Sequence, residues 1–193
     1  VCKLKKYKID FILLAGFAAM TNVTGDYVAL NVHPGDLSIE DEAGHRRFVG
    51  LHAIPVEKAI LAGFNYLRSS VIVALPYSGG GLDEVDSGPI LGVSEPMKVD
   101  FRGHTLSELR IIHQQRQAGV KADDALRELA IHNQELLKYA GDLKVFPAVA
   151  EDYAAGRFRL DEAGRVYFVD DAKVERQVKT IEYHADGSRK LIF

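Results

Sequence analysis

The sequence predicts an α/β protein with a mostly parallel sheet flanked by helices, followed by C-terminal helices and β-hairpins. Two observations predict this class. Continuous apolar runs of strand length alternate with a helical segment in the first half, which is typical of strands buried on both faces. The second half changes to helical periodicity and ends in two alternating segments with glycine turns. At 193 residues the chain can form one well-buried domain, or a domain with an appendage.

Apolar runs predict four strands in the first half. They lie at Lys8–Gly16, Asp26–Val32, Ser69–Tyr77 and Ile90–Met97. The first of these is apolar throughout, so we expect it to be buried on both faces. Pro55–Phe64 predicts a helix, because proline suits a first turn and the apolar residues share one face. A glycine-rich loop at Ser78–Pro89 precedes the last strand.

Three helices and two hairpins are expected after residue 100. Thr105–Glu108 is a capping box, and Gly119 is a plausible end for the helix that it begins. An apolar stripe at helical spacing predicts a second helix over Lys121–Tyr139, and Val145–Gly156 predicts a third. The segments 157–171 and 179–193 each alternate around a glycine turn, so each predicts a hairpin.

Composition excludes several classes of protein. A net charge of −3 gives no electrostatic case for binding nucleic acid or an anionic membrane. Cys2 is the only cysteine, so the chain has no intrachain disulfide and no cysteine metal cluster, and a reducing cytoplasm fits best. The most apolar stretch, Ile9–Met20, is too short to span a bilayer. We therefore expect a cytoplasmic protein.

Polar side chains at one strand end carry the predicted chemistry. Asn31 and His33 finish a strand and share one side of it, and Pro34 and Gly35 turn the chain at once. Ligands of α/β sheets bind at the carboxyl ends of strands. Asp86 stands ahead of a Gly-Pro pair in the glycine-rich loop. Taken singly, the Asn-x-His pair is also consistent with a turn cap, and the aspartate with an ordinary turn residue.

Four motifs together resemble the folate-dependent formyltransferases. They are LAGFAAM, NVHPGDL, VGLHAIPVEKAILAG and DSGPIL, in the family's order and at roughly its spacing. The family includes glycinamide ribonucleotide transformylase, methionyl-tRNA formyltransferase and the sugar-amine formyltransferases. The resemblance covers about Lys8–Leu91, with a looser similarity over Gly141–Phe168. It implies a formyltransferase-like, Rossmann-related catalytic domain.

The resemblance implies formyl transfer from 10-formyltetrahydrofolate to an amine of a purine-precursor-like or amino-sugar-like small molecule, without a metal. Asn31, His33 and Asp86 match the family's catalytic trio. The carboxamide suits stabilisation of an oxyanion, the imidazole suits proton relay, and the carboxylate orients the imidazole. A hydrolase of the same folate and a non-catalytic domain of the same fold are the alternatives; the intact trio argues against the second.

The resemblance also implies where the two substrates bind. We expect the pterin to contact an apolar wall and a loop backbone, formed by Leu14, Phe17, Met20, Leu82, Asp83, Glu84 and Val85. His52 is expected either near the acceptor or as a packing residue. Arg46 and Arg47 are expected either to meet an anionic acceptor or to lie in a solvated loop.

Two departures from the family affect these expectations. After Asn-x-His-Pro the family has Ser and then a Leu-Pro pair, whereas this chain has a longer, acidic segment over residues 35–50. Nothing before Val1 supplies the family's first strand and loop. We therefore expect an N-terminal segment outside this sequence, or a second chain, to complete the sheet beside residues 8–16. The expected units are the C-terminal half of the catalytic domain (1–100), a helical extension and hairpin packed on it (101–171) and a C-terminal hairpin (172–193).

Overall fold

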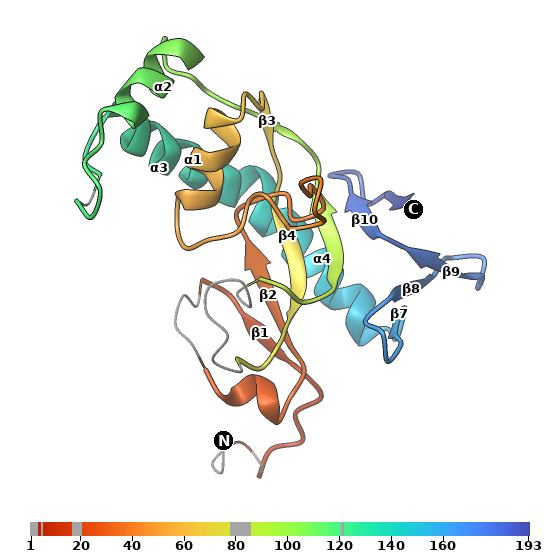
Figure 1. Ribbon diagram of the computed structural model, residues 1–193. Helices are drawn as coiled ribbons and strands as arrows, with labels where there is room; N and C mark the ends of the chain where they lie inside the picture. The colour runs from red at the N-terminus through yellow and green to blue at the C-terminus, as the bar shows by residue number, and fades with distance from the viewer. Residues whose placement is uncertain (1–3, 5, 17–20, 78–85, 121) are drawn as a thin grey trace.

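A computed structural model describes residues 4, 6–16, 21–77, 86–120 and 122–193, and a mixed β-sheet with helices around it organises them (Figure 1). Among these residues six strands form the main sheet, in the order β1-β2-β4-β5-β10-β11. Their bounds are β1 Ile12–Leu14, β2 Ala29–His33, β4 Ser70–Ala74, β5 Ile90–Ser94, β10 Thr180–Tyr183 and β11 Arg189–Ile192. The α/β class is confirmed.

The expected mostly parallel sheet is corrected to a mixed one. β1 pairs with β2, and β5 with β10, in parallel, whereas β2–β4, β4–β5 and β10–β11 are antiparallel. The chain leaves the sheet at His33 and returns beside it, because His33 is paired with Ser70 at the start of β4. A crossover that leaves and returns at the same end of the sheet makes the next strand antiparallel. Apolar runs predict burial of a strand but not its direction.

β1 is shorter and more exposed than its apolar sequence predicts. It pairs only with β2 among the described residues, and Leu13 is 47% exposed. β1 is an edge strand, and an edge strand has a neighbouring strand on one side only, which leaves more of it exposed. Burial on both faces was therefore a wrong expectation for residues 8–16. Completion of the sheet by another segment or chain stays a prediction.

The described residues also form four α-helices around the sheet. Their bounds are α1 Ile54–Leu61, α2 Leu106–Gln114, α3 Ala125–Leu137 and α4 Leu143–Ala154. α1, α2 and α3 pack on one another at one end of the molecule, and α4 runs behind the sheet (Figure 1). α2 begins with the expected capping box, in which Glu108 and Thr105 bond reciprocally. It ends at Gln114, so Gly119 lies beyond it, in a turn.

A π-helical segment, η3 (Lys138–Asp142), joins α3 directly to α4. The two helices expected to be separate are thus one continuous helical run with a wider turn inside it. Gly141 stands where this turn meets the sheet. A Cβ on Gly141 would lie 2.4 Å from the Ser69 Oγ and 3.1 Å from the Ser94 Oγ. The glycine therefore allows the helix backbone to approach β4 and β5 closely.

Apolar cores hold these layers together. One joins the main sheet, α4 and residues 166–169 through residues such as Leu91, Val145 and Phe168, and another joins α1, α2 and α3. Both expected hairpins form. β7 (Phe158–Leu160) pairs with β8 (Val166–Val169), and β10 pairs with β11.

β8 also pairs with β9 (Glu175–Val178), and β3 (Tyr66–Leu67) pairs with β6 (Met97–Lys98). A short 3₁₀ turn, η1, covers Val23–Gly25. The segment expected as one C-terminal hairpin therefore contributes to two sheets, because β9 belongs with β8 whereas β10 and β11 complete the main sheet. In the part of the chain that the structure describes, every helix is too short or too polar to cross a membrane.

Candidate active site

The end of β2 opens into a polar pocket of about 240 Å³. Asn31 and His33 both line it, as strand alternation predicts, and Asp86 and His52 join them from two loops. Gly16, just beyond β1, lines it too. The carboxamide of Asn31 has no hydrogen-bond partner among the described residues, so its N–H group is available to a ligand. The structure thus brings the predicted trio together in one pocket.

His33 is nearly fully buried, and both of its ring nitrogens face protein oxygens. Its Nε2 lies 2.7 Å from the Phe48 carbonyl oxygen. A carbonyl only accepts, so Nε2 carries the proton and donates it. In the neutral ring this leaves the lone pair on Nδ1. Nδ1 lies 3.1 Å from the Asp86 Oδ2, and its lone pair makes it the ring nitrogen that can accept a proton.

The Asp86 carboxylate is 7% exposed and lies beside His33 in a strained turn. Its φ of 61° is in the left-handed region, which aspartate tolerates better than most residues. The contact with His33 is close in distance but lacks hydrogen-bond direction, so Oδ2 has no hydrogen-bond partner among the described residues.

The helical side of the pocket was missed by the sequence interpretation. Gln134 from α3, and Lys138 and Asp142 from η3, complete the lining. The Asp142 carboxylate accepts a hydrogen bond of 2.5 Å from the Ser69 Oγ. Burial raises the pKa of Asp142, while Ser69, Lys138 and His33 oppose the rise. The sequence offered one signal for these residues: Gly141 and Asp142 interrupt an otherwise helical stripe. An interruption of this kind can mark a π-turn, and π-turns often occur at functional sites.

The remaining predicted residues lie in different places. His52 precedes α1, with a φ of 54°. Arg46 lies behind Asp86, in a neighbouring pocket of about 610 Å³ that Glu40 and Ser87 also line. Arg47 is exposed, and its guanidinium lies 5.5 Å from the ring centres of Phe48 and Phe64. Leu14 is paired with Asn31 and is half-buried.

The rest of the expected pterin site cannot be placed. Phe17, Met20, Leu82, Asp83, Glu84 and Val85 lie outside the described residues. Their assignment stays a prediction. Among the described residues, no group of three or more His, Cys, Asp and Glu side chains is placed to hold a metal ion.

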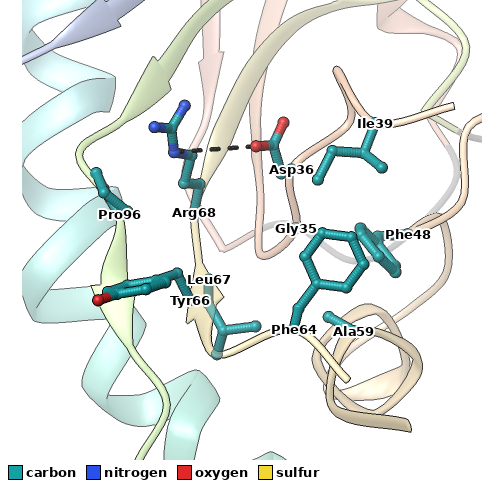
Figure 2. A pocket seen from close by; sticks show the side chains of 10 residues that line it. All are labelled: Gly35, Asp36, Ile39, Phe48, Ala59, Phe64, Tyr66, Leu67, Arg68 and Pro96. Atoms are coloured by element: carbon teal, nitrogen blue, oxygen red, sulfur yellow. Dashed lines mark ion pairs between the residues drawn. The ribbon is translucent and has the colours of Figure 1, made fainter. Parts of the chain in front are cut away.

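A second pocket, of about 300 Å³, lies next to Gly35 and Phe48 and is mainly apolar (Figure 2). Phe64, Tyr66 and Leu67 form much of its wall. Gly35 and Phe48 also contact the His33 imidazole. A Cβ at position 35 would lie 2.8 Å from the Phe48 oxygen and 3.0 Å from the His33 Nε2. Glycine at position 35 therefore leaves room for the His33–Phe48 hydrogen bond.

Comparison with known proteins agrees with a formyltransferase-like fold. No protein-family model and no curated protein match the chain. Phosphoribosylglycinamide formyltransferase from Anaplasma phagocytophilum is similar in structure, with a TM-score of 0.55, 17% sequence identity, and coverage of 95% of this chain and 66% of that one. The enzyme of the same name from Bacillus halodurans has 25% identity and a TM-score of 0.38, with coverage of 74% and 61%.

The chain thus spans slightly less than two thirds of the length of these two structures. The fold is that of the formyltransferases, as the four sequence motifs predict.

Proposed function

We propose that the protein transfers a formyl group from 10-formyltetrahydrofolate to an amine of a small molecule. The observation that carries the proposal is the meeting of Asn31, His33 and Asp86 in one pocket, on a fold shared with a formyltransferase. In the reaction the amine nitrogen bonds to the formyl carbon, and the bond from that carbon to the folate nitrogen breaks. The amine loses one proton and the folate nitrogen gains one.

His33 is suited to moving that proton. Its Nε2–H is committed to the Phe48 carbonyl, so Nδ1 receives the proton from the attacking amine. The imidazolium that forms is stabilised by Asp86, whose Oδ2 has no competing hydrogen-bond partner among the described residues. The same imidazolium then returns a proton to the departing folate nitrogen. Burial of the pair increases this stabilisation, because opposite charges interact more strongly away from water.

Asn31 is suited to stabilising the oxyanion of the tetrahedral intermediate. Its carboxamide N–H has no hydrogen-bond partner among the described residues, so it can donate without first breaking a bond. A preorganised donor of this kind typically contributes on the order of 10²–10³ in rate. The folate would approach past Leu14 and Gly16, which lie at the ends of the strands beside Asn31.

The acceptor is proposed to occupy the helical side of the pocket. Lys138, Gln134 and Asp142 offer a cation, an amide and a carboxyl group there. These groups suit a polar acceptor that carries hydroxyl groups or charge near its amine. Either a purine-precursor-like or an amino-sugar-like molecule has this chemistry.

Substitution of the catalytic pair tests the proposal. Asn31→Ala and His33→Ala should each lower formyl transfer by on the order of 10²-fold, since each removes a group that acts in the transition state. Folate affinity, measured by fluorescence titration, should change much less. His113→Ala is the matched control, because His113 is exposed on α2, away from the pocket.

The products decide between the alternatives. Formate release without formylated amine would indicate a hydrolase, and folate binding without either product would indicate a non-catalytic domain. Near-normal turnover by either pocket variant would refute the roles given to Asn31 and His33.

A further inference from the structure

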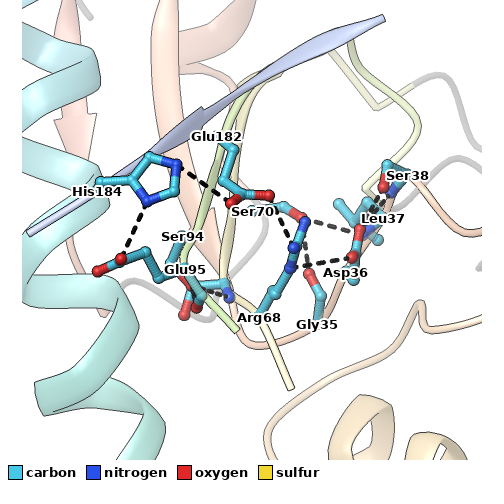
Figure 3. A network of polar contacts seen from close by, with 11 residues as sticks. Gly35, Asp36, Leu37, Ser38, Arg68, Ser70, Ser94, Glu95, Glu182 and His184 are labelled. Carbon is cyan, nitrogen blue, oxygen red and sulfur yellow. Dashed lines mark hydrogen bonds and ion pairs between the residues drawn. The ribbon is translucent and has the colours of Figure 1, made fainter. Parts of the chain in front are cut away.

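Residues 36–49, the main part of the acidic segment that follows Asn-x-His-Pro, are anchored at their start to β4 (Figure 3). The Ser70 Oγ donates a 2.7 Å hydrogen bond to the Gly35 carbonyl. The same Oγ accepts a 3.0 Å hydrogen bond from the Leu37 amide. Leu37 is fully buried. The first residues of the segment are therefore held against β4.

The middle of this segment closes on itself as a tight turn. The Arg47 amide donates to the Ile39 carbonyl, and the Asp41 amide donates to the His45 carbonyl, at 3.0 and 2.9 Å. The Asp41 carboxylate accepts hydrogen bonds from the amides of Ala43 and His45. This geometry fixes the direction in which the returning segment, residues 45–48, leaves the turn.

The returning segment contacts both members of the His33–Asp86 pair. The Arg46 guanidinium donates one hydrogen bond to the Asp86 carbonyl and another, of 2.8 Å, to the Gly88 carbonyl. Two residues later, the Phe48 carbonyl accepts from the His33 Nε2. Residues 46–48 thus hold the imidazole through the Phe48 carbonyl and the turn of Asp86 through the Arg46 side chain.

We propose that residues 46–48 form a brace for the catalytic pair, in which Arg46 is a positioning residue and not an acceptor ligand. The inference rests on the proposed function of the pocket. Asp86 is in a left-handed conformation that costs free energy, and two hydrogen bonds from Arg46 hold the carbonyls of that turn in place. Arginine suits the role because its planar fork can reach two carbonyls at once, whereas lysine is a single point charge.

The charge around Arg46 agrees with this assignment. Burial lowers the pKa of Arg46, and the nearby carboxylates of Asp86 and of Glu40, which is paired with Arg46 across the turn, oppose that lowering in part. Arg46 lines the neighbouring pocket behind Asp86, and not the pocket that holds Asn31 and His33. Its influence on the reaction therefore passes through the Asp86 turn and the Phe48 carbonyl.

Arg46→Gln and Arg46→Lys in the full protein test the brace. We expect kcat to fall on the order of 10²-fold, the effect of displacing catalytic groups by about 1 Å, while KM for the formyl donor stays nearly constant. We also expect loss of the slowly exchanging His33 Nε2–H signal in ¹⁵N-edited NMR. Arg46→Lys should restore neither kcat nor the His33 Nε2–H signal. Free guanidinium ion should restore part of kcat to Arg46→Ala.

Arg110→Gln is the matched control, since Arg110 donates two hydrogen bonds to the Leu61 carbonyl on the far side of the helical layer. Wild-type kcat and an unchanged His33 signal in Arg46→Gln would overturn the brace. Full rescue by lysine would overturn it too, because one charge would then suffice. If the wild-type protein has no formyl-transfer or hydrolase activity, the proposed function fails, and the NMR signal alone still decides whether Arg46 positions His33.

Discussion

Replacing Gly35 by serine, the residue usual at this position in the formyltransferases, should destabilise this protein and impair His33. A Cβ at position 35 would lie 2.8 Å from the Phe48 oxygen, 3.0 Å from the His33 Nε2 and 3.1 Å from the Pro55 Cβ. The Phe48 oxygen belongs to the backbone, and Pro55 is fixed in the first turn of α1. The imidazole and the loop must therefore separate, and their 2.7 Å hydrogen bond breaks.

The magnitude follows from two contributions. Leaving a buried donor and acceptor unpaired costs about 1–3 kcal/mol. Overpacking of a close-packed site costs about 1–3 kcal/mol as well. The two overlap, because movement of the loop relieves the clash, so we expect a net loss of about 3 kcal/mol. For a chain of this size that corresponds to a fall of roughly 6–12 °C in the unfolding temperature.

Differential scanning calorimetry measures the change, and Gly25→Ala is the control. A methyl group on the Gly25 Cα would have no atom within 4 Å, and Gly25 has no left-handed φ, so alanine there should be neutral or slightly stabilising. Turnover of Gly35→Ser should also fall, because Nε2 loses the acceptor that fixes the ring. An unfolding temperature equal to that of the wild type would refute the close packing of Gly35, Phe48 and His33.

Three further substitutions test other parts of the site. Burial raises the pKa of Asp142, so the folded protein loses stability as the pH rises from 3.8 through that higher value; Asp142→Asn should therefore raise the unfolding temperature more at pH 7 than at pH 3, and a smaller gain at pH 7 would contradict the raised pKa. Gly141→Ala places a Cβ 2.4 Å from the Ser69 Oγ and should cost about 1–3 kcal/mol in urea unfolding, whereas an unchanged midpoint would show that η3 can move away. Gly88→Ala places a Cβ 1.7 Å from the Val73 carbonyl oxygen and should speed hydrogen exchange at the Val73 amide; unchanged exchange would mean that the turn is held elsewhere.

Local patterns predicted much of this fold because they are set by neighbouring residues. The capping box at Thr105 and the glycine turns of both hairpins form as expected, and β2 ends with Asn31 and His33 on one side. The direction of β4 was not predictable in this way. It depends on where the chain returns to the sheet after α1, and no single segment encodes that.

The partners of the candidate site were harder to predict than its members. The residue types of Asn31, His33 and Asp86 indicate their chemistry, so sequence motifs can find them. The acceptor for the His33 Nε2 is a backbone carbonyl, which every residue possesses, and its position depends on the course of residues 36–49. Asp142 lines the pocket from η3, a π-turn whose presence no local pattern predicts.

The wider turn of η3 also marks the one place where this helical run can change in length. A π-turn bonds i to i+5 and so holds one residue more than an α-turn, and losing one residue between 138 and 142 would leave a regular α-turn there. Val145 and Val149 would then keep their places in the core under the sheet, whereas a deletion elsewhere in the run would rotate them out of it by about 100°. We therefore expect single-residue deletions in related chains to fall at η3 and not in α3 or α4.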